Sequence, residues 1–347
     1  MPVLHDSACV VHLHSTYSDG TGTVPEIAAA ARANALDVVL LTDHDTMAAR
    51  DHGEEGWHGS VLVLVGEEVS PPGRNHYLAF GLDRPVDHEG LSPAQILDAV
   101  AAGGGFGFAA HPFSHGNPNF GRVGKAMPWG DLDAPALAGI ELWSFVTDTA
   151  ETLGGWRDVA RFVARPQVRV DHPPERNMAE YDRLCASRRV VALGGLDAHQ
   201  IGLRIGGRVP LRLMSYRRSF RFLRTHVLTR EPLAGVLAPD RAEVLGALRE
   251  GRCYIAMDAV APARGFAFWG DDGIDMGAQG PASALHVRLP RPARLRLVRD
   301  GAVIADLPGA AALDHAVEDG GVYRVEARLP AYGRERTWIL SNPIYMR

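Results

Sequence analysis

The chain has 347 residues, of which 46% are hydrophobic and 22% are charged, proportions that are ordinary for a globular protein with a large core. The 41 acidic residues outnumber the 36 basic ones, which gives a formal net charge of −5. This balance argues against a broad grip on nucleic acid or other polyanions, although a local basic pocket stays compatible with it.

The three cysteines, Cys9, Cys185 and Cys253, are scattered without paired spacing. An odd, sparse set favours a reducing compartment, so we expect a cytoplasmic protein. No run approaches 18 apolar residues, and the first residues lack the basic and apolar parts of a secretory signal, so neither a membrane span nor an export signal is expected. The sequence does not predict the oligomeric state.

Short apolar runs alternate with helix-like segments between residue 9 and about residue 258. The expected strands are residues 9–14, 36–45, 61–70, 76–82, 106–112, 139–144, 190–199 and 252–258, and the clearest helices are residues 24–35, 92–105 and 241–251. Ser92 is the expected cap of the second helix, with Pro93 in its first turn. Such an alternation indicates a mostly parallel sheet covered by helices. Polar residues at the strand ends favour a closed or nearly closed barrel, whose site would lie at the carboxyl ends of its strands.

The pattern changes after about residue 260, where residues 283–290, 293–307 and 321–330 alternate apolar and polar side chains. Asp300-Gly301, inside the run of residues 293–307, is a hairpin signal. We therefore predict two domains, a barrel over residues 1–259 and a small antiparallel β-sandwich-like accessory domain over residues 260–347. Trp338 and Tyr345 are candidates for packing this second part onto the first.

His12 and His14 lie two apart in an expected strand, so their imidazoles share one face. Two such imidazoles form a natural pair of metal ligands, although a pair alone fits a buried core equally well. Further carboxylates and imidazoles end other apolar strands, namely Asp43, His44, Asp45, Glu67, Glu68, His76, His111, Glu141, Asp197 and His199. This recurrence predicts a multinuclear metal site at one end of the sheet.

These segments also carry a resemblance to a known family. In chain order, HLHSTYSDG, LLTDHD, GEEVS, NHYLAFG, FAAHP, GIELW and GGLDAH resemble the motifs of the PHP (polymerase and histidinol phosphatase) family over roughly residues 9 to 258. The C-terminal part, which ends RTWILSNPIYM, resembles the tail of PHP proteins of the CehA/McbA type. The resemblance implies a distorted (β/α)7 barrel with a di- or trinuclear metal centre.

The resemblance also implies a ligand set. His12, His14 and Asp197 would bind one ion, Glu68 would bridge it to a second ion completed by His76 and His111, and Asp19, His44 and His199 would hold a third. The family's Gly-x-Glu pattern selects Glu68, with Glu67 as the alternative. Imidazole and carboxylate ligands suit zinc, manganese or iron, so two or three of these divalent ions are the expected cofactors.

Other residues are expected to support the ligands. Asp43 and Asp45 are interpreted as partners that orient imidazoles. Glu141 is interpreted as a carboxylate hydrogen-bonded to a ligand, and a role as a ligand itself stays open.

The candidates for the catalytic machinery lie in loops. His115, beside Ser114, is the candidate proton donor to a leaving group. Arg204 and Arg208, or Arg122 and Lys125, are candidates for binding a phosphate. For each of them, an ordinary loop or surface residue is the alternative.

Bridged ions lower the pKa of a trapped water and polarise an electrophile, so we predict a metal-dependent phosphoesterase acting on a small phosphorylated molecule. Three alternatives stay open: hydrolysis of a carboxyl or carbamate ester, a nuclease, and a metal-binding module without catalysis. The nuclease rests on RRSFRFLR, residues 217–224, in which arginines and aromatics mix as in single-strand binders. The acidic balance of the chain argues against it.

Overall fold

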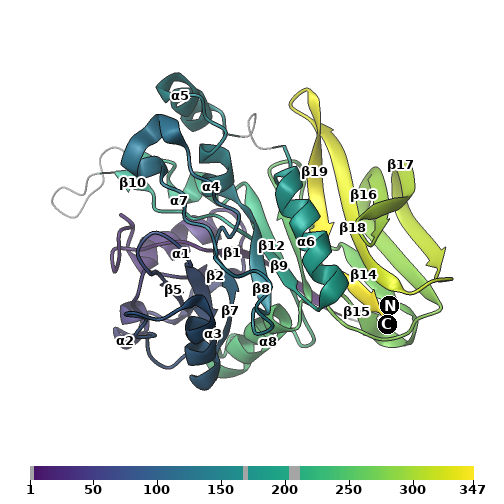
Figure 1. The fold of residues 1–347 in the computed structure, drawn as a ribbon, viewed down its shortest axis with the longest axis horizontal. Helices are drawn as coiled ribbons and strands as arrows, with labels where there is room; N and C mark the ends of the chain where they lie inside the picture. The colour runs from purple at the N-terminus through teal and green to yellow at the C-terminus, as the bar shows by residue number, and fades with distance from the viewer. Residues whose placement is uncertain (1–3, 167–170, 203–211) are drawn as a thin grey trace.

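Two large β-sheets with helices packed around them form a mixed α/β fold (Figure 1). The computed structural model describes residues 4–166, 171–202 and 212–347. Arg204 and Arg208 therefore lie outside the described residues.

The larger sheet contains 13 strands. They are β1 (His5–Val11), β2 (Val38–Leu41), β3 (Gly56–His58), β4 (Val61–Val65), β12 (Leu223–Thr229), β13 (Cys253–Met257), β14 (Ala267–Gly270), β15 (Ile274–Asp275), β16 (Ala284–Arg299), β17 (Ala302–Ala316), β18 (Gly321–Ala331), β19 (Arg334–Ser341) and β20 (Ile344–Met346). The smaller sheet contains β5 (Glu67–Val69), β6 (Tyr77–Phe80), β7 (Phe106–Ala109), β8 (Gly139–Ser144) and β9 (Val191–Gly195), and β10 (Ile201–Gly202) pairs with β11 (Arg212–Leu213).

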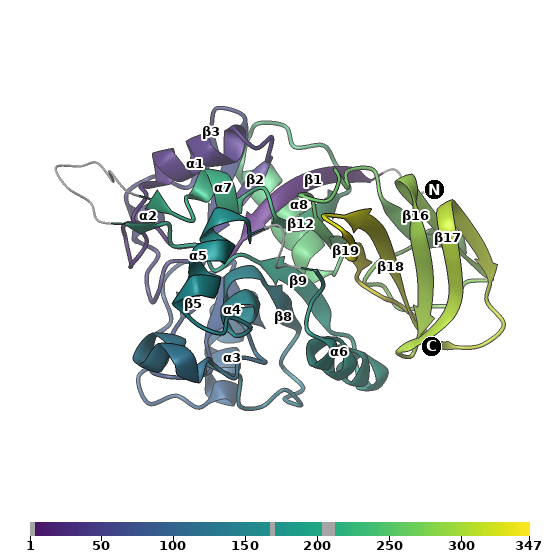
Figure 2. The same ribbon diagram turned by 90° about the horizontal axis from the view of Figure 1, so that it is seen from above.

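Helices cover the sheets in the first three quarters of the chain (Figure 2). They are α1 (Val24–Arg32), α2 (Ala48–Asp51), α3 (Pro93–Ala102), α4 (Phe145–Ala150), α5 (Trp156–Ala164), α6 (Glu175–Ser187), α7 (Tyr216–Ser219) and α8 (Leu237–Arg249), with short 3-10 turns η1 (Pro118–Gly124) and η3 (Asp271–Gly273). The expected cap of α3 is confirmed, because the Ser92 side chain accepts a hydrogen bond from the Gln95 N–H and Pro93 starts the helix.

The closed seven-stranded barrel that the sequence predicts is not seen in the described residues. The strands divide into separate sheets, and several pairs, including β1–β12, β5–β6 and β6–β7, are antiparallel. Part of the reason is connection length. Residues 70–76 join β5 to β6, and a parallel crossover needs a dozen residues or more. The parallel pairs that remain include β1–β2, β2–β4, β7–β8 and β8–β9.

The two sheets meet where their strands end. Beyond β1 and β9, Leu13 bridges to Ala198, and the His14 N–H donates to the Ala198 carbonyl at 3.0 Å. Beyond β2, His44 bridges to Glu68. The segments that carry the predicted ligands are thus the segments through which the sheets are joined by backbone hydrogen bonds.

The strands after residue 260 are antiparallel, as expected, but they continue the larger sheet. β13 pairs with β19, so strand pairing crosses the predicted domain boundary, which itself stays a prediction. Asp300 and Gly301 both have positive φ and connect β16 to β17, which confirms the hairpin signal.

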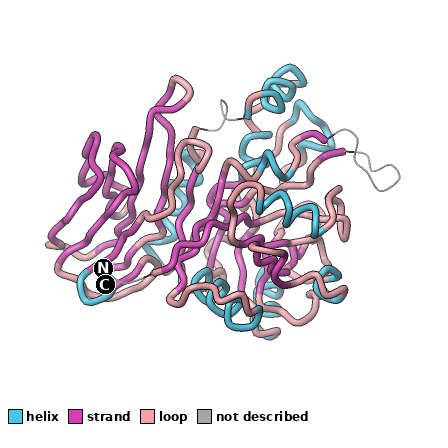
Figure 3. Tube along the Cα trace, turned by 180° about the vertical axis from the view of Figure 1, so that it is seen from behind, coloured by secondary structure: helices cyan, strands magenta, loops and turns pink. Residues whose placement is uncertain are grey.

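The C-terminal strands are tied to the rest of the chain by buried polar contacts. The Tyr345 hydroxyl accepts a hydrogen bond from the Val190 N–H at 2.9 Å, just before β9. Helix α6 lies between the sheets (Figures 1 and 2), and the Arg324 guanidinium on β18 forms two hydrogen bonds with Asp182 on this helix, at 2.7 and 2.8 Å. Figure 3 shows the strand-rich C-terminal part beside the helix-covered part.

Within the described residues, no helix has the length and apolar character to cross a membrane. Cys9, Cys185 and Cys253 are buried free thiols.

A buried ion pair joins β12 to β1. His226 Nδ1 lies 2.7 Å from Asp6 Oδ1, and the imidazole stacks on the Tyr254 ring. Burial alone would lower the pKa of His226, but Asp258 and Asp6 raise it above its ordinary value. A histidine whose pKa is raised by folding stabilises the fold fully below about pH 6.5, and this contribution disappears as the pH rises through the raised pKa.

We therefore expect His226→Gln to lower the free energy of unfolding most at about pH 6, by on the order of 2–4 kcal/mol, and least at about pH 9. Glutamine keeps a neutral donor but not the charge. Urea denaturation at the two pH values measures the difference. His52→Gln, at an exposed histidine whose ring faces the Ala48 carbonyl, is the control. An equal loss at both pH values would contradict a charged His226.

Candidate metal centre

Nine side chains from both sheets converge at the junction of the strand ends. His12 and His14 follow β1, Asp19 lies in the next turn, His44 follows β2, Glu68 lies in β5, His76 precedes β6, His111 follows β7, and Asp197 and His199 follow β9. Four overlapping groups have ligand atoms within 4.8 Å of one another: His14, Asp19, His44 and His199; His12, Glu68 and His111; His12, His14 and Asp197; and His44, Glu68 and His76.

The Glu68 carboxylate lies in the middle of these groups and is buried. Its Oε2 atom is 3.3 Å from both His12 Nε2 and His14 Nε2. Its Oε1 atom is 2.9 Å from His76 Nδ1 and 3.4 Å from His111 Nε2. Oε2 also lies 3.1 Å from His44 Nδ1. The two oxygens therefore face different sets of imidazoles, as those of a carboxylate between two ions would.

Several of these atoms are buried without a hydrogen-bond partner. They include His12 Nε2, both ring nitrogens of His14 and Glu68 Oε2. Such atoms are costly unless something satisfies them. Ligand atoms about 2.0–2.1 Å from one tetrahedral ion lie about 3.3 Å apart, which is close to the 3.3–3.6 Å separations among His12, His14, Glu68 and Asp197. The residues present thus fit divalent ions.

The buried carboxylates of Glu68 and Asp197 are ionised, which is the state that metal binding requires. Burial alone would raise the pKa of Glu68, but His12, His111 and His76 hold it well below its usual range. Burial opposes ionisation of Asp197 in the same way, and His12, His14 and His199 hold its pKa well below normal. Both groups are therefore ionised near neutral pH and act only as acceptors or ligands.

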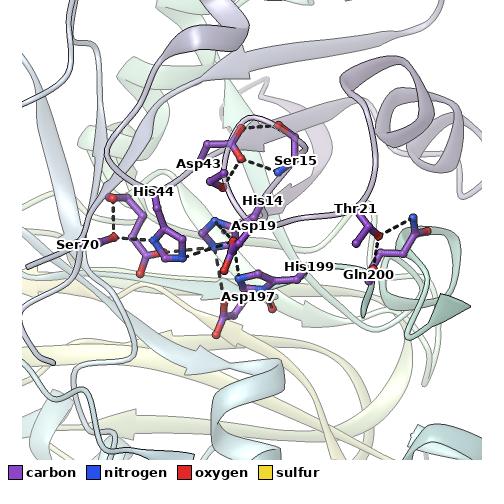
Figure 4. A network of polar contacts seen from close by, with 12 residues as sticks. His14, Ser15, Asp19, Thr21, Asp43, His44, Ser70, Asp197, His199 and Gln200 are labelled. Atoms are coloured by element: carbon purple, nitrogen blue, oxygen red, sulfur yellow. Dashed lines mark hydrogen bonds and ion pairs between the residues drawn. The ribbon is translucent and has the colours of Figure 1, made fainter. Parts of the chain in front are cut away.

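The third predicted group is the most open part of the centre. Asp19 Oδ1 lies 3.2 Å from His199 Nε2 and 3.7 Å from His44 Nε2, and the His14 ring stacks against the rings of both His44 and His199 (Figure 4). The side chains of Asp19, His44 and His199 are 59%, 28% and 26% exposed, whereas His12 and His14 are fully buried. Solvent therefore reaches the centre from this side.

Glu141 on β8 supports two of the nine residues. Its Oε1 atom lies 2.9 Å from His12 Nδ1, and its Oε2 atom accepts a hydrogen bond from the His111 N–H at 2.7 Å. As the acceptor of this hydrogen bond, Glu141 keeps a proton on His12 Nδ1, which leaves Nε2 as the ligand atom facing Glu68. Glu141 thus hydrogen-bonds a candidate ligand, which is the interpretation that the sequence favoured.

The expectation that Asp43 and Asp45 orient imidazoles of the centre is wrong. Asp43 accepts hydrogen bonds at 2.6 Å from the Ser15 N–H, the Ser15 hydroxyl and the Ser18 hydroxyl, and so folds the turn between His14 and Asp19 (Figure 4). Asp45 pairs with His88 at 2.9 Å.

Ser70 contacts a candidate ligand instead, since its hydroxyl lies 2.7 Å from His44 Nδ1. No sequence signal singled out Ser70, because its contact depends on how β5 lies beside the end of β2.

Glu67 does not join the centre. Its Oε1 atom accepts a hydrogen bond from the Val86 N–H at 2.8 Å, and burial raises its pKa to about 7. Adjacent residues of a strand point to opposite faces, which accounts for the contrast with Glu68.

His115 lies outside the group of nine. Its Nε2 atom is 3.2 Å from Glu151 Oε2, its side chain is 55% exposed, and within the described residues it has no hydrogen bond, ion pair or ring contact with the nine. Ser114 also donates to Glu151, at 2.8 Å. Lys125 is exposed. The catalytic roles predicted for His115 and Arg204 stay predictions.

The arginine-rich segment of residues 217–224 does not offer aromatic rings for stacking on bases. Phe220, Phe222 and Leu223 are buried in the core, and Phe222 stacks on Phe145. This placement removes the feature on which the nuclease alternative rested.

No protein-family model matches the sequence, and no curated protein matches it either. Among solved structures, a two-domain protein from Bacteroides vulgatus that contains a predicted PHP-like metal-dependent phosphoesterase is 16% identical over 97% of this chain and 95% of that chain, with a TM-score of 0.45.

Two further structures match over 59% of this chain. A proposed metal-dependent phosphoesterase from Bifidobacterium adolescentis is 20% identical, with 92% of that chain covered and a TM-score of 0.38. An amidohydrolase from Chromobacterium violaceum with bound sulfate and no metal is 17% identical, with 90% covered and a TM-score of 0.31. At these scores the likenesses transfer no activity to this chain, and the chemistry of the centre rests on its own residues.

A glycine on β9 makes room for Glu141. A Cβ atom at Gly195 would lie 1.9 Å from Glu141 Oε1 and 3.0 Å from the His12 Cβ. We expect Gly195→Ala to displace Glu141 and to lower the free energy of unfolding by about 1–3 kcal/mol.

Urea denaturation tests this prediction, with Gly246→Ala in α8 as the matched control. No atom lies within 4 Å of the added Cβ at Gly246, so the control should be neutral or more stable by up to about 1 kcal/mol. Equal stability of the Gly195→Ala protein and the wild type would show that Glu141 is not confined by β9.

Proposed function

We propose that the chain is a metal-dependent hydrolase, and most specifically a phosphoesterase that acts on a small phosphorylated molecule. The nine residues His12, His14, Asp19, His44, Glu68, His76, His111, Asp197 and His199 would hold two or three divalent ions of zinc, manganese or iron. The observation that carries this proposal is the buried Glu68 carboxylate, whose two oxygens contact different imidazoles with nitrogens spaced like ligands of shared ions.

The charge of the ligand set favours an anionic substrate. Asp19, Glu68 and Asp197 supply three negative charges, and the six histidines are neutral when they bind metal. Two divalent ions would bring four positive charges and three ions would bring six, so either occupancy leaves the centre positive. A phosphate ester suits such a site better than a neutral ester does.

The bound ions would supply Lewis acidity and a water of lowered pKa, and hydrolysis needs no redox cofactor. Within the chain, Glu68 would fix the histidines that contact one of its oxygens relative to those that contact the other. Glu141 would hold the proton on His12 Nδ1. The open side, with Asp19, His44 and His199, is where a substrate would approach, since the other ligands are covered by the sheets.

The test is hydrolysis by metal-stripped protein that is reconstituted separately with manganese, iron(II) or zinc. The substrates are phosphomonoesters, phosphodiesters, and aryl carboxyl and carbamate esters. We expect metal-dependent phosphate release, and a fall in kcat/KM of at least about 100-fold in Asp197→Asn. Asp306→Asn, at a residue that pairs with Arg294 on the C-terminal strands, should leave the rate unchanged.

Turnover of the carboxyl or carbamate esters alone would replace the phosphoesterase by an esterase with the same centre. Turnover that persists after metal removal, or in Asp197→Asn, would contradict the proposal. A metal-loaded protein that hydrolyses none of these classes would favour the binding module without catalysis.

A further inference from the structure

The segment formed by β8 and α4 supplies none of the nine side chains, yet it contacts them at more than one point. Besides Glu141, Thr147 on α4 reaches the centre, since its hydroxyl donates a hydrogen bond to Asp197 Oδ2 at 2.9 Å. We propose that Thr147 is a positioning residue that holds Asp197 as a ligand through one oxygen only.

The two oxygens of Asp197 have different surroundings. Oδ1 lies 3.6 Å from both His12 Nε2 and His14 Nε2, and 3.5 Å from His199 Nδ1. Oδ2 is the oxygen that Thr147 binds. The carboxylate therefore offers one oxygen to the imidazole cluster and gives the other to helix α4.

The backbone around this contact is well constrained. Asp197 has a φ of 51°, which few residues other than glycine adopt, so the base of its side chain is directed by the end of β9. The Val146 N–H donates to the carbonyl of Leu196 at 3.3 Å, which ties α4 to the residue before Asp197.

Helix α4 is itself anchored on both sides of Thr147. Phe145 is buried and stacks on Phe222, with ring centroids 5.0 Å apart. Asp148 accepts a hydrogen bond from the Ser144 N–H at 2.8 Å. Threonine is β-branched and has few χ1 rotamers in a helix, so the helix restricts the directions that its hydroxyl can take.

This arrangement has a consequence for the open positions of the centre. Without the hydroxyl, Oδ2 is free to rotate toward the ion that Oδ1 faces. Two-oxygen binding would then fill a position that water or substrate needs. The inference thus deepens the proposed function, and it depends only on metal binding and not on the identity of the substrate.

The test compares Thr147→Val, which removes the hydroxyl at nearly constant shape, with Thr147→Ser, which keeps it. The protein is loaded with cobalt(II), and the visible absorption of the ion and its release to a chelator are measured. We expect Thr147→Val to lower the intensity of the cobalt bands, as a higher coordination number does, and to change metal release by about 10- to 100-fold. Thr147→Ser should resemble the wild type.

Thr149→Val is the matched control, because the Thr149 hydroxyl bonds only the Phe145 carbonyl of the same helix among the residues that the structure describes. A Thr147→Val protein with the wild-type spectrum and release rate would overturn the inference. Equal changes in Thr147→Val and Thr149→Val would also overturn it, since they would show a general loosening of α4. If the protein hydrolyses no ester but the Thr147 effect is observed, the proposed function alone is overturned. If the wild type binds no cobalt, both the proposed function and the role of Thr147 are overturned.

Discussion

The structure depends on a carboxylate that is buried among imidazoles. Glu68, His12 and His14 are buried, and several of their polar atoms have no hydrogen-bond partner among the residues that the structure describes. An isolated charge in such a place is expensive, so the arrangement is stable in a folded protein only if opposite charge or protons compensate it. Divalent ions would do so for several of these atoms at once.

The candidate ligands come from both sheets, so a metal centre here would link the two sheets as well as form a reaction site. His12, His14 and His44 come from strands of the larger sheet, whereas Glu68, His76, His111 and Asp197 come from the smaller one. Ions held between them would cross-link two sheets that also pack through shared hydrophobic clusters and a few backbone bridges. Metal binding and folding should therefore be coupled.

Local features could be predicted from the sequence because they depend on neighbouring residues. The cap of α3 at Ser92 and the Asp300-Gly301 hairpin are examples. The nine residues of the centre came from a resemblance in motifs, and the structure brings them together.

Strand direction was harder to predict, since the same apolar runs fit parallel and antiparallel neighbours. For this reason the predicted closed barrel is not seen in the described residues. The partners of Asp43, His44 and Asp197 could not be predicted either. The bond between Thr147 and Asp197 joins residues 50 positions apart, and only the order of the strands brings them together.

The pairing of β13 with β19 also bears on how this chain can be cut. A cut at residue 260 would strip β13 of its neighbour and leave an edge with free N–H and C=O groups, a known template for aggregation. It would also open a cavity at Val190, where Tyr345 now binds. The two parts behave in this respect like halves of one folding unit, and the N-terminal part expressed by itself would be prone to associate through its bare edge.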